Sequence, residues 1–111
     1  MAYYGTAPIS RKEIPAMTKF RLGQIVITKG LAERMNEDTD FYLFIWVSLT
    51  RHANGDWGDI CDEDNAVNEE ALKDGNRLVS KYLRKDHPND KILIITEADR
   101  SVTTVLFPSE Y

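Results

Sequence analysis

The sequence contains a single cysteine, Cys61, so no disulfide can form within one chain. An unpaired thiol suits a reducing compartment. Residues 1–18 lack the apolar core of a secretory signal peptide, and both observations lead us to expect a cytoplasmic protein. The longest apolar run, 41–47, has seven residues, whereas a membrane-spanning helix needs about 20. We therefore expect no membrane association.

Motifs of several large enzyme and nucleic-acid-binding classes are also missing. We find no Walker loop, dinucleotide fingerprint, zinc-ligand pattern, nucleophile elbow or aromatic-basic RNA motif. The net charge of −4 argues against direct nucleic-acid binding. We accordingly assign no catalytic residue, metal or cofactor, and we expect the partner to be another protein. The oligomeric state stays open.

The chain has 111 residues and an ordinary apolar fraction of 42%, which is enough for one domain with its own core. We expect that domain over residues 19–111. Residues 1–18 show no regular period and contain Pro8 and Pro15, so they predict a loosely docked arm. An alternative is that three apolar side chains of the arm cover a sheet edge or a partner: Tyr3, Tyr4 and Ile9.

The C-terminal part predicts three consecutive antiparallel strands. Residues 92–96 and 102–107 are almost wholly β-branched or large and apolar, and the charged segment 97–101 between them is typical of a hairpin turn. Residues 77–83 alternate well enough to precede them as a third strand. The first apolar strand, 92–96, is apolar on both faces and should lie inside the sheet. A further strand is predicted over 19–28, with Gly23 at a bend.

Two helices are predicted from their end signals. Residues 41–52 run without alternation from a cap at Thr39 or Asp40 to the terminator Asn54-Gly55. Residues 62–74 begin with acidic side chains and end before Gly75, with Val67, Ala71 and Leu72 as the apolar stripe. A shorter helical segment is expected over 31–35. The predicted fold is α+β: an antiparallel sheet of about four strands, including the C-terminal three-stranded meander, packed with two to three helices.

The candidate chemistry lies in the polar loop 51–59. Its glycines indicate a tight turn, and Trp57 between them is expected to anchor the loop to the core. His52, Asp56 and Asp59 could meet as an acid–base or metal site, although their spacing matches no metal motif. The competing interpretation is structural, with both aspartates capping neighbouring backbone and His52 near the helix dipole. We therefore name His52, Asp56, Trp57 and Asp59 as candidate binding residues.

Two further polar features are present. At the predicted hairpin tip, Glu97, Asp99 and Arg100 could bind an anion or a carboxylate, although such tips are commonly solubilising turns. Residues 54–74 contain one lysine among eight acidic residues, which indicates a solvated helix face or an acidic surface that competes with nucleic acid for a basic protein. The acidic residues are Asp56, Asp59, Asp62, Glu63, Asp64, Glu69, Glu70 and Asp74.

Three segments of this chain resemble a family of small bacterial proteins carried on plasmids, phages and other mobile elements, usually labelled plasmid-related. The segments are 22–28, 51–59 with Asn68 downstream, and 94–108. The resemblance covers residues 20–111, and the apolar segment 41–50 is longer than is typical of the family. It implies an accessory role in a bacterial cytosol and carries over no catalytic residue. A restriction–modification label carried by some members has no support here, because the methyl-donor glycine loop and catalytic tetrapeptide are absent.

These observations predict a non-enzymatic accessory binding protein of a bacterial mobile element. Its acidic loop–helix surface would modulate a host nucleic-acid or defence system. The alternative is a small metal-dependent hydrolase or nuclease that uses His52, Asp56 and Asp59.

Overall fold

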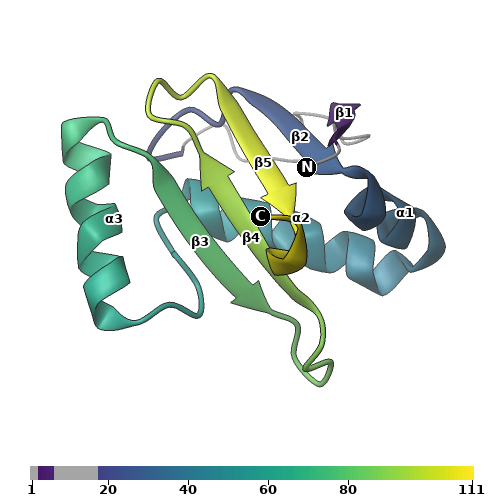
Figure 1. The fold of residues 1–111 in the computed structure, drawn as a ribbon. Coiled ribbons are helices and arrows are strands. Elements are labelled where there is room, and N and C mark those ends of the chain that lie inside the picture. Colours follow the sequence, from purple (N-terminus) through teal and green to yellow (C-terminus); the bar gives the residue numbers. More distant parts are fainter. Residues whose placement is uncertain (1–2, 7–17) are drawn as a thin grey trace.

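A computed structural model describes residues 3–6 and 18–111 of the chain (Figure 1). In chain order the elements are β1 (Tyr3–Thr6), β2 (Gln24–Thr28), α1 (Lys29–Glu37), α2 (Thr39–Ala53), α3 (Asp62–Asp74), β3 (Leu78–Leu83), β4 (Lys91–Thr96), β5 (Val102–Leu106) and the short 3₁₀ helix η2 (Pro108–Glu110). The predicted α+β class is therefore confirmed.

The strands form one mixed sheet in the order β1-β2-β5-β4-β3. The predicted meander is confirmed, because β3, β4 and β5 pair antiparallel in sequence. One pairing departs from a purely antiparallel sheet: β2 runs parallel to β5. At the outer edge, β1 pairs antiparallel with β2, and a role of the Tyr3, Tyr4 and Ile9 side chains in covering that edge stays a prediction. Ile9 lies outside the described residues.

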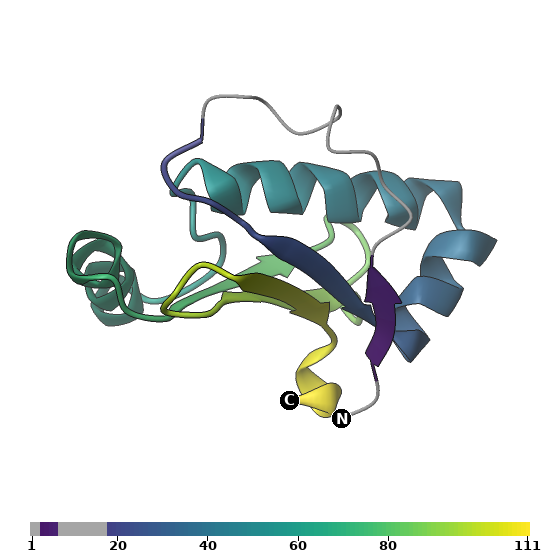
Figure 2. The same cartoon turned by 90° about the horizontal axis from the view of Figure 1, so that it is seen from above.

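The main core lies between the sheet and α2, which crosses one face of the sheet (Figure 2). Successive side chains of a strand point to opposite faces. Ile92 and Ile94 of β4 are fully buried in this core, and Ile95 on the other face is 3% exposed. The prediction that this strand lies inside the sheet is confirmed, because β4 has a hydrogen-bonded neighbour on each side.

The predicted aromatic helix is confirmed as α2, but its N-cap lies one residue before Thr39 and two before Asp40. The Asp38 carboxylate accepts the Phe41 backbone N–H at 3.1 Å, so neither Thr39 nor Asp40 is the N-cap. This bond holds the pKa of Asp38 below its usual value. Helix α1 also extends beyond the predicted 31–35. Within the described residues, no helix combines the length and apolar character needed to cross a bilayer.

The strand predicted over 19–28 is wrong in its first half, because β2 begins only at Gln24. Gly23 has φ of +66°, and a side chain there would collide with the backbone of Arg100 and Ser101. The chain therefore turns at Gly23. Phe20, before the turn, packs against the rings of His52 and Trp57 instead of extending the sheet.

Helix α3 lies beside β3, away from the main core (Figure 1). Its predicted limits are confirmed, and Gly75 closes it in the left-handed conformation. The predicted apolar stripe is wrong at Val67, which is 63% exposed. Ala71 is buried as predicted, and Asn68 is buried in place of Val67, because the side of α3 facing the sheet meets the polar backbone edge of β3.

Candidate functional site

The loop after α2 is held to the protein by Trp57, which is 2% exposed. Its ring stacks on Phe20 with centroids 6.1 Å apart and meets His52 edge-on at 5.7 Å. Its indole N–H donates to Glu69 of α3 at 3.1 Å. Trp57 is therefore the predicted anchor, and it joins the loop to both α2 and α3.

Asp56 is engaged inside the loop. Its carboxylate accepts two hydrogen bonds from Arg51, at 2.7 and 3.1 Å, and one from the Gly58 N–H at 3.2 Å. The Arg51 bond is the main cause that lowers the pKa of Asp56. The Asp56 carbonyl in turn accepts the Tyr82 hydroxyl at 2.6 Å. These contacts fix the turn that carries Trp57.

Asp59 covers the open edge of β3. Its carboxylate accepts the Leu83 N–H at 2.9 Å, and its own N–H donates to the Lys81 carbonyl at 2.6 Å. The Lys81 N–H donates to the Trp57 carbonyl at 3.3 Å. Farther along, the Asn68 side-chain amide pairs with both backbone groups of Val79, at 2.7 and 3.1 Å. The loop and α3 thus occupy the outward-facing backbone groups that would otherwise invite pairing with another chain.

Replacing Asp59 by alanine should lower the free energy of unfolding by about 1–2 kcal/mol, because the Leu83 N–H loses its charged acceptor. Asp59→Asn keeps an acceptor oxygen and should lose clearly less. Chemical denaturation of the two variants measures the difference. Equal losses would mean that the charge of Asp59, and not its hydrogen bond to β3, stabilises the edge.

His52 is fully buried between α2 and the sheet, and both ring nitrogens have partners. Nδ1 lies 2.6 Å from the Ser80 hydroxyl and Nε2 lies 2.9 Å from the Thr96 hydroxyl. The Thr96 hydroxyl lies 2.8 Å from that of Thr103, which donates to the Leu22 carbonyl at 2.6 Å. A continuous chain of buried polar groups therefore links three strands to α2.

The donor–acceptor direction of these hydrogen bonds fixes the tautomer of His52. Because the Thr103 proton goes to a carbonyl, the Thr103 oxygen accepts from Thr96. The Thr96 oxygen then accepts from His52, so Nε2 carries the ring proton and Nδ1 accepts from Ser80. Burial, and secondarily the charge of Arg100, lower the pKa of His52 to about 3.

The three residues proposed for a metal or acid–base site therefore point to different places. His52 faces the core, Asp56 pairs with Arg51, and Asp59 binds the edge of β3. Across the described part of the chain, no group of three or more His, Cys, Asp or Glu side chains is placed to hold a metal ion. The capping interpretation of both aspartates is what these hydrogen bonds show.

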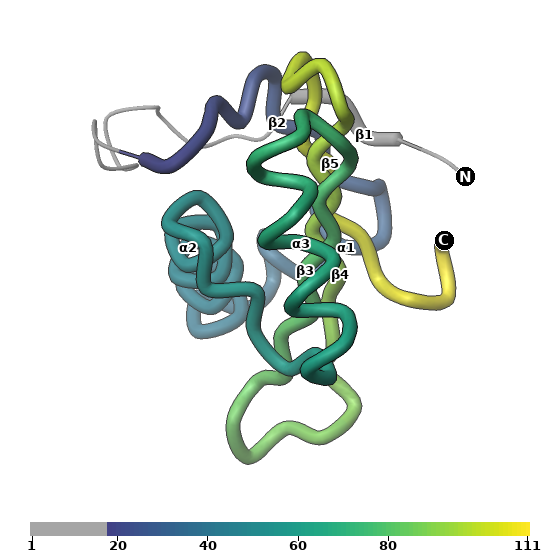
Figure 3. Tube along the Cα trace, turned by 90° about the vertical axis from the view of Figure 1, so that its left-hand side faces the viewer, coloured from purple at the N-terminus to yellow at the C-terminus, as the bar shows by residue number. Residues whose placement is uncertain are grey.

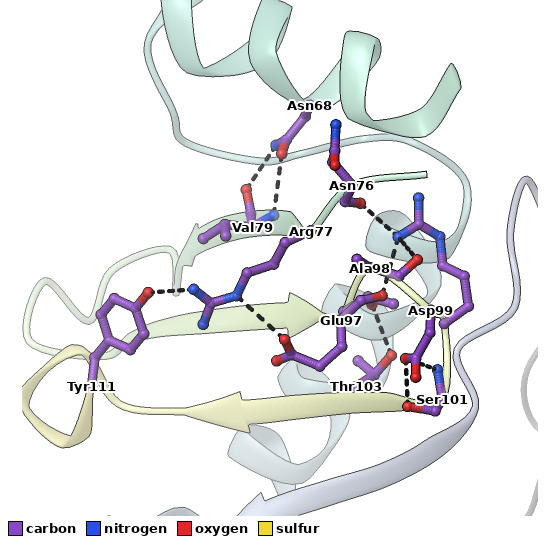
Figure 4. A network of polar contacts seen from close by, with 12 residues as sticks. Asn68, Asn76, Arg77, Val79, Glu97, Ala98, Asp99, Ser101, Thr103 and Tyr111 are labelled. Carbon is purple, nitrogen blue, oxygen red and sulfur yellow. Dashed lines mark hydrogen bonds and ion pairs between the residues drawn. The ribbon is translucent and has the colours of Figure 1, made fainter. Parts of the chain in front are cut away.

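The hairpin tip is also occupied by contacts within the chain (Figure 4). Asp99 accepts the Ser101 hydroxyl at 2.6 Å and the Ser101 N–H at 3.0 Å, and the hydroxyl bond is the main cause that lowers the pKa of Asp99. Glu97 lies 3.7 Å from Arg77, which donates to the Tyr111 hydroxyl at 2.9 Å. These pairs form a short polar ladder across the end of the sheet.

Arg100 closes this end of the fold. With φ of +60°, its backbone directs the guanidinium at four carbonyls. Nη1 donates to Asn76, Glu97 and Ala98 at 2.6, 3.1 and 3.3 Å, and Nη2 donates to Ala71 at the C-terminus of α3 at 3.2 Å. A cation near the last carbonyls of a helix is also favoured by the helix dipole. Arg100 therefore ties α3 to the β4–β5 turn.

One ionic cluster was not foreseen from the sequence. Asp90 accepts two bonds from Arg34, at 3.2 and 3.1 Å, and one from Arg84 at 3.0 Å. Arg84 also donates to the cap residue Asp38 at 3.2 Å, and both guanidinium groups lie over the ring of Phe41. The cluster joins the β3–β4 loop to the α1–α2 corner. Its members come from distant segments, so no local pattern indicates it.

The acidic residues of α3 are the largest group in the candidate site that stays exposed. Among contacts between the described residues, Glu69 is the one acidic side chain of the six that accepts a hydrogen bond, from Trp57. Within the described residues, none of the six forms an ion pair. Comparison of the chain with protein-family models, with curated proteins and with solved structures finds no match in any of the three.

Proposed function

We propose that this chain is a non-enzymatic accessory protein of a bacterial mobile element, and that it binds another protein through the acidic surface of α3 and the preceding loop. The resemblance of segments 22–28, 51–59 and 94–108 to plasmid-related proteins supports the setting. The charge distribution of α3 supports the mode of binding.

The observation that carries this proposal is the pair Glu70 and Asp74. Acidic residues in the first turn, Asp62–Asp64, stabilise a helix through its dipole. At the C-terminal end the dipole has the opposite sign, and two like charges four residues apart repel each other. Both side chains are exposed. The dipole disfavours Asp74, Asp74 repels Glu70, and among the described residues neither carboxylate forms an ion pair with Lys73. A basic partner would favour both charges.

A basic partner suggests a nucleic-acid-binding protein. Such proteins carry lysine and arginine on the surface that contacts phosphate. An exposed acidic helix competes for that surface, and its binding weakens with salt because exposed charges are screened. Through this competition the chain would modulate a nucleic-acid or defence system of the host.

The alternative, a metal-dependent hydrolase or nuclease, gains no support from the site. His52 has no exposed surface, and its two nitrogens are used by Ser80 and Thr96. Asp56 and Asp59 are engaged with Arg51 and the β3 edge. A metal ion there would have to displace contacts that hold the loop.

The test is capture from a bacterial lysate with wild-type chain and with the double variant Glu70→Gln, Asp74→Asn. Removing the two charges should leave stability unchanged or raise it by a few tenths of a kcal/mol, because the repulsion and the unfavourable dipole contact are lost. The double variant should nevertheless capture much less of the partner than the wild type does. The captured protein should be basic, should be released by moderate salt, and should be displaced by added DNA.

A matched control is Glu33→Gln with Glu37→Gln on α1, which removes two exposed charges at the other edge of the sheet. This variant should capture the partner as the wild type does. If the α3 variant and the α1 variant capture equally, α3 is not the binding surface. If DNA fails to displace the partner, competition with nucleic acid is wrong.

A further inference from the structure

The sheet face opposite α2 is only partly covered. Among the described residues, no α-helix lies over β3 on this side, and the C-terminal segment 107–111 crosses β4 (Figures 1 and 3). Cross-strand neighbours on this face are Lys81 with Leu93 and Leu83 with Lys91. Leu83 is 43% exposed. We call these four residues, together with Val79, the open patch.

The open patch combines apolar side chains with positive charge. Val79, Leu83 and Leu93 supply the apolar surface, and Lys81 and Lys91 supply two cations. Within the described residues, neither lysine forms a salt bridge. A sheet face of this kind is normally buried under another element. Its complement is a helix with apolar and acidic side chains.

Helix α3 presents such a surface toward the same side of the molecule. Glu69 contacts Trp57 on the α2 side, and at about 100° per residue positions 63, 67, 70 and 74 lie on the opposite flank. This α3 flank consists of Glu63, Val67, Glu70 and Asp74, all exposed. Val67, 63% exposed, lies between the acidic side chains.

We propose that a second copy of this chain covers the open patch, with the α3 flank of each copy packed on the open patch of the other. The inference rests on the proposed function, since the same acidic helix is the binding element. It adds the regulation of that surface: in the dimer the α3 flank is covered, so an external partner competes with the second copy.

The order of the elements makes the two surfaces self-complementary. Asp59, just before α3, binds Leu83, and Asn68 binds Val79, so α3 runs antiparallel to β3. A two-fold axis that runs parallel to β3 and passes between β3 and α3 leaves the directions of both elements unchanged in the partner copy. Glu63 of each copy then meets the end of the other open patch that carries Leu83 and Lys91. The helix cannot reach the patch of its own chain, because it is bound to the edge of β3.

Charge reversal tests the inference on the purified chain alone, by light scattering after size exclusion and by sedimentation. The wild type should show a dimer fraction that rises with concentration. Variants Glu63→Lys with Glu70→Lys, and Lys81→Glu with Lys91→Glu, should each dissociate roughly tenfold or more readily, because like charges face each other in both contacts. An equimolar mixture of the two variants should recover the dimer, since every contact again joins opposite charges.

The control Glu33→Lys with Glu37→Lys changes the net charge as much as the α3 variant does but lies on α1, and it should dimerise as the wild type does. A wild type that stays monomeric at the highest soluble concentration would overturn the inference while leaving the lysate test of the proposed function unaffected. So would a dimer that both variants retain, or a mixture that fails to associate. If a monomeric wild type instead binds an acidic helical peptide on the open patch, the second copy is the wrong occupant.

Discussion

Gly58→Ala should lower the free energy of unfolding by about 3 kcal/mol or more. Gly58 has φ of +79°, which a residue with a Cβ rarely adopts. A Cβ there would also collide with the Lys81 carbonyl and lie 2.6 Å from Cδ1 of the Tyr82 ring. The loop could relieve this only by leaving β3, which breaks the bonds of Trp57 and Asp59 to Lys81. Guanidinium denaturation, followed by the combined fluorescence of Trp46 and Trp57, measures the loss.

Gly75→Ala is the matched control. Gly75 has nearly the same backbone conformation, with φ of +76°, but a Cβ there has nothing within 4 Å. Its substitution should cost only the backbone strain, about 1–2 kcal/mol. The difference between the two variants isolates the close approach of the loop to β3. Equal losses at both glycines would show that the loop can move away from the edge strand at no cost.

The parts of the fold that local signals determine could be predicted from the sequence. Helix α2 followed from its length, its lack of alternation and its Asn54-Gly55 terminator, and α3 from its acidic first turn and Gly75. The meander followed from two apolar strands and a short charged turn. In each case the determining contacts lie within a few residues of one another, so the pattern is visible in one short stretch.

The wrong predictions concern positions whose conformation or burial depends on residues that are distant in the sequence. Gly23 ends the predicted strand because the β4–β5 turn, about 80 positions later, packs against it. The apolar side chain of Val67 predicts a buried position in α3, but Asn68 is buried instead, because its side chain binds the Val79 backbone at the edge of β3. This buried polar contact forms because β3 is an edge strand beside α3, and the sequence of α3 alone does not indicate that neighbour.

The sequence predicts a tight, anchored turn over residues 51–59 and allows two interpretations of its polar side chains. The glycines and Trp57 indicated a tight, anchored turn, and the structure has one. The role of the Asp59 carboxylate depends on Leu83 of β3, 24 positions away in the sequence. The Asp56 carboxylate has local partners, Arg51 and Gly58, but their hydrogen bonds form only in the folded turn. A role of these residues in partner binding stays a prediction. The open patch combines residues of β3 and β4, so it is defined by the pairing of these two strands and not by a pattern within one segment.

Acid should destabilise the protein through His52 well before its carboxylates protonate. In the unfolded chain a histidine has a pKa of about 6.5. In the folded protein, burial and secondarily the charge of Arg100 lower the pKa of His52 to about 3. Between these values the unfolded state binds the extra proton, so stability is complete above about pH 6.5 and falls by about 1.4 kcal/mol per pH unit below it. Asp38, Asp56, Asp90 and Asp99, whose folded pKa values are lowered, add their losses only below about pH 4.5.

Denaturation curves recorded from pH 7 to pH 4.5 should therefore show the free energy of unfolding fall by about 2–3 kcal/mol. His52→Gln keeps polar atoms near Ser80 and Thr96 but cannot take up a proton. This variant should be less stable at pH 7 and nearly insensitive to pH over the same range. The same substitution at the exposed His87 should leave the slope in place. A slope that persists in His52→Gln would assign the acid sensitivity to other groups, and the protonated ring would then be tolerated between Ser80 and Thr96.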